Sequence, residues 1–154
     1  MKFSEMTYTR PDPAASKQRL SALTAELKAA KSYEEARKVF LSQQELMSHI
    51  STAATLTRHS IDTRDEFYDG EEKFWNNFNP ELEEYNQTWT AAMLESPFRA
   101  DFEKEYGDLM FVNAEIALKT FSPAIIPELQ QENDLTQEYE KLLASVQIPF
   151  EGKG

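Results

Sequence analysis

Cysteine is absent from this chain of 154 residues, and only four glycines and seven prolines occur in it. Without cysteine the chain can form no disulfide, which excludes a disulfide-stapled secreted fold and favours a reducing compartment. We therefore expect a cytoplasmic location. The few glycines and prolines are scattered, so no segment has the composition of a flexible linker, and we expect a single domain.

Histidine is also scarce, because the chain contains only His49 and His59. The common catalytic zinc motif, His-Glu-x-x-His, places two histidines four residues apart on one helical face. The two histidines here are ten residues apart, and neither begins such a motif. At 3.6 residues per turn they point to different faces of a helix. We therefore expect no catalytic residue, no metal ligand and no cofactor in this chain.

Long apolar runs and excess positive charge are missing as well. No window approaches the ~18 apolar residues of a membrane span, and the first residues, MKFSEMTYTRP, contain no apolar core of a signal peptide. Sixteen basic residues against 27 acidic ones give a net charge of −11 and a pI of about 4.7. An acidic surface repels polyanions, so we expect neither a nucleic acid nor a membrane as a partner.

Helix-capping signals divide the chain into short segments. A capping residue precedes proline, or stands three residues before a glutamate, at five places, and each pattern is typical of a helix start. These are Asp12-Pro13, Ser32 with Glu35, Asn79-Pro80, Ser96-Pro97 and Ser122-Pro123. Gly107 is placed to end a helix, and Pro127 is expected to end or kink one. The signals predict an all-α domain over 13–147, with seven or eight helices joined by short turns and the last starting near Asp134.

The two ends of the chain are predicted to be extended. Residues 1–12 carry β-leaning residues and a proline, which favours an extended arm. Residues 148–154 combine Pro149 with the turn signal Glu151-Gly152-Lys153. We expect this tail to be the start of a truncated hairpin.

Apolar residues at helical spacing predict which faces are buried. The aromatic series Phe67, Phe74 and Phe78 has two interpretations: core packing, which we favour, or a wall that grips peptide side chains. The other stripes that we expect to face the core are Leu20, Leu23 and Leu27; Leu109, Val112 and Ile116; and Leu135, Tyr139, Leu142, Leu143 and Val146.

The corner from Arg58 to Glu66 packs two arginines, a histidine and three acids into nine residues. Asp62 or Thr63 is expected to cap the helix that follows. One interpretation is a solvent-exposed helix corner with surface ion pairs. The other is that the corner faces a substrate channel or an interface, with contacts from Arg58, His59, Asp62 and Arg64.

The same stretch carries a family resemblance. Thr57-Arg58-His59-Ser60-Ile61-Asp62-Thr63, followed by Asp65-Glu66-Phe67-Tyr68 and Glu71, resembles the N-terminal helical region of oligoendopeptidase F, a thimet-oligopeptidase-like zinc metallopeptidase. Other segments are similar to that family in the same order: KFSEM from Lys2, Tyr8 to Asp12, Leu94 to Arg99, Leu118 to Pro123, and Tyr139 to Gln147.

The resemblance implies a lobe without its catalytic part. In that family such a lobe forms part of the wall of a deep channel that admits short peptides, and a separate helical portion binds zinc. Its partners would be that remaining portion and the peptide substrate, while this chain alone would be inactive. The alternative is a stand-alone acidic helical binding module. If a larger part is missing, we also expect an exposed apolar patch, at Phe67–Phe78 or the tail, and self-association through it.

Overall fold

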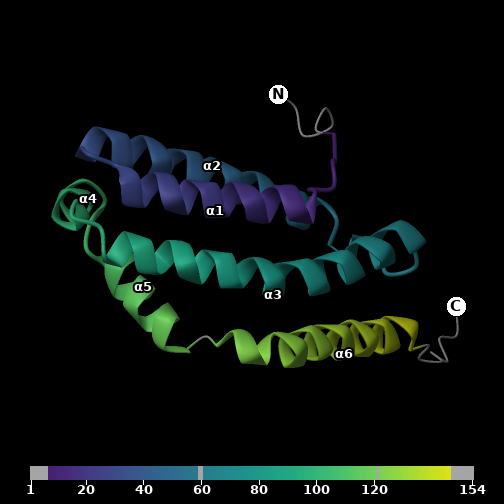
Figure 1. Cartoon of the computed structure of the whole chain (residues 1–154). Helices are drawn as coiled ribbons and strands as arrows, with labels where there is room; N and C mark the ends of the chain where they lie inside the picture. The colour runs from purple at the N-terminus through teal and green to yellow at the C-terminus, as the bar shows by residue number, and fades with distance from the viewer. Residues whose placement is uncertain (1–6, 59–60, 121, 147–154) are drawn as a thin grey trace, which may run out of the picture.

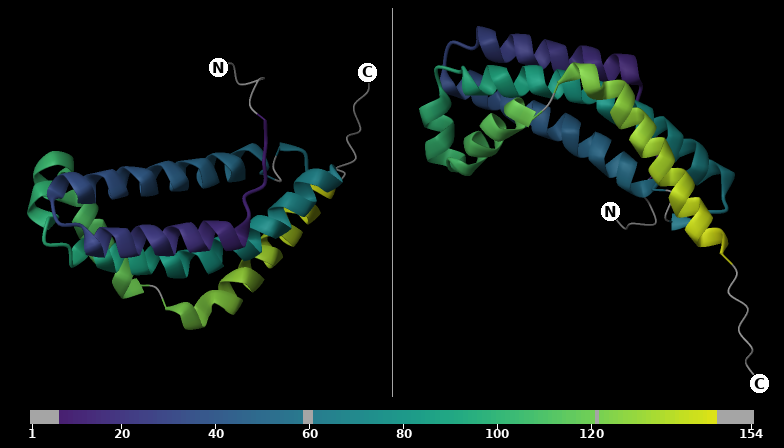
Figure 2. Two further views of the ribbon diagram at one scale, coloured as in Figure 1. Left: turned by 45° about the horizontal axis from the view of Figure 1, so that its top comes forward. Right: turned by 90° about the horizontal axis from the view of Figure 1, so that it is seen from below.

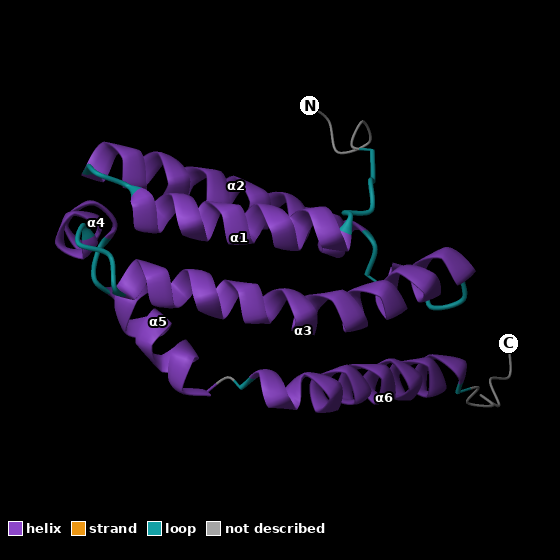
Figure 3. Cartoon of the chain, in the orientation of Figure 1, coloured by secondary structure: helices purple, strands orange, loops and turns teal. Residues whose placement is uncertain are grey.

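The structure is a computed structural model that describes residues 7–58, 61–120 and 122–146 (Figure 1). These residues form six α-helices and one short 3-10 helix, and they contain no strand (Figure 3). The prediction of an all-α fold is confirmed, with fewer helices than the seven or eight expected. In chain order the elements are α1 (Pro13–Ala29), α2 (Tyr33–Leu56), α3 (Glu66–Leu94), α4 (Arg99–Tyr106), α5 (Leu109–Thr120), η3 (Pro123–Ile125) and α6 (Ile126–Ser145).

The first two helices begin at the predicted caps. The Asp12 side chain accepts a hydrogen bond from the amide of Ala15, and Pro13 stands in the first turn of α1. Ser32 accepts from the amide of Glu35 at 3.2 Å. The Glu35 carboxylate accepts from the amide of Lys31 at 2.8 Å, one residue before the partner expected in a capping box.

Helix α3 is one continuous element where two helices were predicted, because Asn79-Pro80 lies inside it. Proline has no amide hydrogen, so the carbonyl of Asn76, four residues earlier, loses its helical donor. The side-chain amide of Asn133 in α6 donates to that carbonyl at 3.4 Å, and Gln130 donates to the next carbonyl, of Asn77, at 3.1 Å. The amide side chains of α6 therefore support α3 where proline would weaken it.

The last helix also differs from the prediction. It begins at Ile126 rather than near Asp134, and Pro127 lies in its first turn. A first-turn amide needs no helical partner, so proline starts this helix instead of ending or kinking one. Gly107 ends α4 as predicted, with a φ of 86° and its amide bonded to the carbonyl of Glu103 at 2.9 Å.

The core lies where α1 packs against both α2 and α3 (Figures 1 and 2). Leu20, Leu23 and Leu27 of α1 are buried as predicted. At one end of the bundle α4 inserts Phe102, fully buried, beside the rings of Tyr33 and Phe40. The remaining core residues are Ala36, Ile50, Trp75, Phe78, Leu82, Trp89, Ala92, Met93 and Phe111.

Three predicted apolar stripes are not buried as expected. In α5 the buried residue is Phe111, whereas Leu109, Val112 and Ile116 are exposed. The predicted core stripe of α6 is exposed as well: Leu135, Tyr139, Leu142, Leu143 and Val146. In the aromatic series Phe78 is buried, but Phe67 is 48% exposed, so the core interpretation holds only for part of it. An exposed apolar surface is therefore present, but mostly on α5 and α6 rather than at Phe67–Phe78.

No helix among the described residues is long and apolar enough to cross a membrane. Residues 1–6 and 147–154 lie outside the described part, so the first half of the predicted arm and the whole of the predicted tail stay predictions. Residues 7–12 belong to no helix and lead into α1.

Candidate functional site

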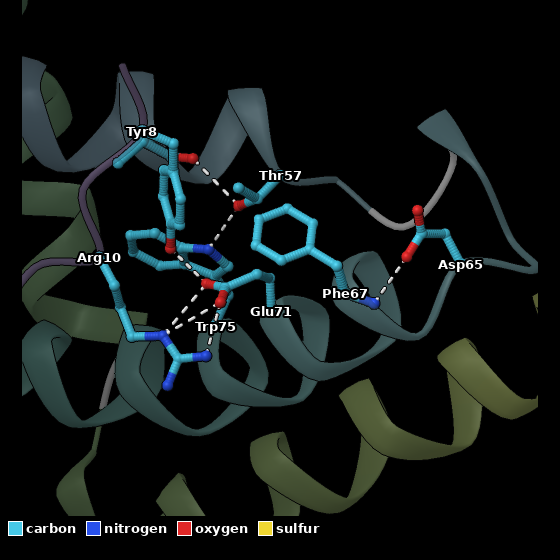
Figure 4. A network of polar contacts seen from close by, with 8 residues as sticks. Tyr8, Arg10, Thr57, Asp65, Phe67, Glu71 and Trp75 are labelled. Carbon is cyan, nitrogen blue, oxygen red and sulfur yellow. Dashed lines mark hydrogen bonds and ion pairs between the residues drawn. The ribbon is translucent and has the colours of Figure 1, made fainter.

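A buried carboxylate in α3 fixes the segment that precedes α1. The Glu71 side chain is 5% exposed and faces two residues from the beginning of the chain (Figure 4). Arg10 donates through Nε to both carboxylate oxygens, at 3.1 and 3.2 Å, and through its terminal nitrogen to Oε1. The hydroxyl of Tyr8 donates to Oε2. The arginine also lies over the ring of Phe74, 4.8 Å from its centroid.

The pKa shifts of this cluster follow from burial and hydrogen bonding. Burial by itself would raise the pKa of the Glu71 carboxyl, but the hydrogen bonds from Arg10 and Tyr8 outweigh it and lower that pKa. Burial, together with the bond to Glu71, raises the pKa of the Tyr8 hydroxyl to about 12. A carboxylate with a lowered pKa and three donors is a poor general base at neutral pH. We therefore interpret the cluster as a structural clamp and not as a catalytic site.

A second buried polar contact joins the end of α2 to α3. Trp75 donates through its indole nitrogen to the hydroxyl of Thr57 at 2.9 Å, and that hydroxyl donates to the carbonyl of Ala53 at 3.0 Å. Thr57 is 1% exposed and is the residue that caps α2. The chain therefore enters the charged corner from a fixed point, next to the Glu71 cluster (Figure 4).

The corner itself is turned to solvent in the residues that the structure describes. The Arg64 side chain is 92% exposed and lies 3.9 Å from Asp62. The Asp62 side chain accepts from the amide of Arg64 at 3.0 Å. The predicted caps, Asp62 and Thr63, are wrong: Asp65 caps α3 by accepting from the amide of Phe67, because Asp62 is used in the preceding turn. His59 lies outside the described residues.

Arg58 stands at one end of a groove between α2 and α3. Three hollows follow one another along these helices, with volumes of about 380, 290 and 270 Å³. The first and second share Met47 and Asn86, and the second and third share Ala54 and Asn79, so they form one groove, which we call the α2–α3 groove. It exists because α1 packs against both helices while α2 and α3 make few close approaches to each other.

The α2–α3 groove combines an apolar floor with side-chain amides. Apolar side chains such as Ile50, Leu82 and Met93 line it, and α5 closes its far end with Phe111. Carboxamides have both donors and acceptors, so they can bond to the N–H and C=O groups of a peptide. The amides that line it are Gln43, Gln44, Asn76, Asn79, Asn86 and Asn113.

No metal site was found in the described part of the chain, where no three His, Cys, Asp or Glu residues form a group that could hold an ion. The carboxylates of Glu71 and Asp69 are paired with Arg10 and Lys141. The side chains that the structure describes therefore do not fit a zinc ion.

Comparison with known proteins assigns the family. The family model of the Peptidase M3 N-terminal domain matches residues 3–121. The chain belongs to this family. Among curated proteins no match was found.

Solved structures similar to this M3 N-terminal domain are several times longer than it. A Bacillus anthracis protein assigned as an oligoendopeptidase F is 36% identical, with a TM-score of 0.93. The match covers 99% of this chain and 28% of that one. A second oligoendopeptidase F structure is 40% identical, with a TM-score of 0.93 and coverage of 99% and 27%. Pz peptidase A, solved with an inhibitor, is 38% identical, with a TM-score of 0.92 and coverage of 98% and 27%.

The chain therefore spans little more than a quarter of the length of these relatives. It is the N-terminal domain of an oligoendopeptidase F-like M3 peptidase, and the catalytic part is absent from it. The resemblance inferred from the sequence is confirmed. The clamp of Tyr8 and Arg10 on Glu71 was not predicted, since its members are 61 and 63 residues apart. The family resemblance covered the segments that contain these residues, but it did not indicate that the segments contact each other.

Proposed function

We propose that this M3 N-terminal domain forms one wall of the substrate channel of a zinc peptidase that cleaves short peptides, with the α2–α3 groove facing the peptide. M3 peptidases are zinc-dependent in general. In this proposal the zinc is held by the catalytic part, since the described residues of this chain do not fit it. In this proposal the enzyme is cytoplasmic, since a reducing compartment suits a domain without cysteine.

The length and lining of the groove are the observation that carries the proposal. From Phe40 to Thr55 helix α2 spans about 22 Å at 1.5 Å per residue, which matches about seven residues of extended peptide. The methionines of the floor adapt to different side chains, while the carboxamides can bond to any peptide backbone. Such a surface binds peptides by length more than by sequence.

Arg58 would then meet one end of the bound peptide. It lines the last hollow together with Thr55 and Asn79, and it is exposed. A guanidinium at the end of a groove is suited to a carboxylate, because its donors match both oxygens. Under this proposal Arg58 contacts the peptide, whereas Asp62 and Arg64 form the surface turn that follows.

Two measurements test the proposal. The reading frame that encodes this domain should continue into a His-Glu-x-x-His motif. In the complete enzyme, Asn86→Leu should raise the KM for peptides of about seven residues while leaving kcat unchanged. Gln18→Leu, on the exposed face of α1, is the matched control and should leave both constants unchanged. Equal KM values for the wild type and the Asn86 variant would contradict the role of the groove.

A further inference from the structure

Helix α6 presents its polar side to the bundle. Gln137, buried at 5% exposure, donates to the Asp69 carboxylate at 2.9 Å and accepts from Asn76 at 3.3 Å. Lys141 pairs with the same Asp69 carboxylate, and Asn133 bonds to the backbone of Asn76. Asn133, Gln137 and Lys141 are four residues apart, so they lie along one side of α6, the side that faces α3.

The opposite side of α6 is apolar, and it is exposed among the residues that the structure describes. Leu135, Tyr139, Leu142 and Val146 are 58, 60, 62 and 57% exposed. The spacing of the first three, four and then three residues, places them in one stripe of α6, and Val146, the residue that caps the helix, follows four residues later. Leu135 and Tyr139 each follow an α3-facing residue by two positions. Two positions are about 200° around a helix. The polar stripe and this outward stripe therefore lie on opposite sides of α6.

This arrangement is the reverse of an ordinary surface helix, which buries its apolar side. The core of the described bundle contains no residue of α6. Burying a leucine side chain is favourable by about 1.5–3 kcal/mol, so four exposed members of one stripe leave a large contribution unused. Exposed apolar patches of this kind mark interfaces.

The charged residues beside the stripe indicate which partner surface is complementary to it. The acidic side chains Glu132 and Glu138 are exposed, and an open hollow beside Leu135 and Tyr139 is lined by Glu128 and Glu132. Two copies of α6 would therefore bring acid against acid, in a chain whose net charge is −11. An apolar groove with basic residues at its rim is complementary to the stripe.

The related structures supply a partner of the required size. Their match includes nearly all of this chain, α6 among it, yet it covers only 27–28% of their own length. We propose that the outward stripe of α6 is the surface on which the catalytic part of the peptidase packs, through an apolar groove with a basic rim. This proposal rests on the proposed function, because it takes its partner from it.

The test uses the complete enzyme with a cleavable sequence inserted after Gly154. After site-specific cleavage, gel filtration and titration measure whether the N-terminal domain stays bound to the remainder. The Leu135→Glu/Leu142→Glu double variant should raise the Kd at least about 30-fold, which is the effect of losing one interface hot spot. The matched control, Gln18→Glu/Ala25→Glu, adds the same two charges at the same spacing on the exposed face of α1 and should bind like the wild type.

Folding of the variants is checked by circular dichroism of the isolated 154-residue chain. The two double variants should give the same spectrum. Two results of the cleavage experiment would overturn the proposal: dissociation of the two wild-type products, or an unchanged Kd for the stripe variant. A third would be a dimer of the isolated chain that the stripe variant abolishes while the two products of the cleaved stripe variant remain bound to each other. Peptide cleavage by the uncut enzyme is measured in parallel. If the two cleavage products stay bound through the stripe but the uncut enzyme has no peptidase activity, the proposed function is refuted and the docking surface is not.

Discussion

Removing the carboxylate of Glu71 should destabilise the domain by a predictable amount. Glu71→Gln keeps the size of the side chain but removes the charge to which Arg10 and Tyr8 bond. Breaking a fully buried pair costs about 3–5 kcal/mol, but the Arg10 side chain is 51% exposed and can return to water. Hydrogen bonds to charged groups contribute about 1.5–3 kcal/mol, so we expect the free energy of unfolding to fall by about 2–3 kcal/mol.

The pH dependence gives the prediction its sign. The folded-state pKa of Glu71 is lowered from its ordinary value by the bonds from Arg10 and Tyr8, so the unfolded chain binds a proton more readily than the folded one. The stabilisation is therefore fully present above about pH 4.5, the pKa of an unperturbed carboxyl. It is lost as the pH falls through the lower folded-state pKa. The deficit of the Glu71→Gln variant should be constant from pH 6 to 8 and should shrink in acid.

Urea unfolding at pH 7 and at several lower pH values measures both effects. Glu84→Gln makes the same substitution at an exposed position of α3 and is the matched control. A domain of this size loses about 2–4 °C in Tm per kcal/mol, so the Glu71 variant should melt roughly 4–12 °C lower than the control. A difference below about 0.5 kcal/mol, the range of ordinary surface substitutions, would refute the reasoning. A deficit that does not change in acid would show that charge is not its cause.

Three further predictions concern other parts of the chain. Thr57→Val leaves the indole N–H of Trp75 without its acceptor and should cost about 1–3 kcal/mol, whereas Thr57→Ser keeps the hydroxyl and should cost clearly less; equal losses in chemical denaturation would contradict the hydrogen bond. Phe102→Ala removes a fully buried ring and should cost about 3–5 kcal/mol, well above Tyr106→Ala, whose parent residue is 38% exposed; similar melting temperatures for the two would refute this. The isolated chain should hold far less than one equivalent of zinc in metal analysis and cleave no peptide, and chelator-sensitive cleavage by protein of verified mass would refute that.

Helix starts that depend only on residues nearby in the sequence could be predicted from it. Asp12-Pro13 and Ser32 begin helices as expected, because a cap is satisfied within one turn. Asn79-Pro80 carries the same local signal but lies inside α3. The outcome there depends on the side chains of Gln130 and Asn133, which are more than 50 residues away. No local pattern contains that information.

The faces of the helices were harder to predict than the helices themselves. The spacing of Leu135, Tyr139 and Leu142 correctly identifies one apolar side of α6. Periodicity shows which residues share a side of the helix, but it does not show which side packs against the rest of the protein. In this chain the bundle contacts the polar side of α6 and leaves the apolar side exposed. The candidate site shows the same limit. Arg58 could be singled out by its charge, whereas the groove that it ends depends on how α1 separates α2 from α3.

The hydrogen bonds that side-chain amides of α6 donate to α3 bear on where the boundary of this domain should be drawn. The match to the family model ends at residue 121, before Gln130 and Asn133 are reached. A polypeptide cut at that border would keep every residue by which the family is recognised. It would lack the Asn133 side chain that donates to the carbonyl of Asn76, where Pro80 supplies no amide hydrogen. The segment that the family model matches therefore ends before the residues that support α3 at Pro80, and a shortened fragment of this domain should include α6.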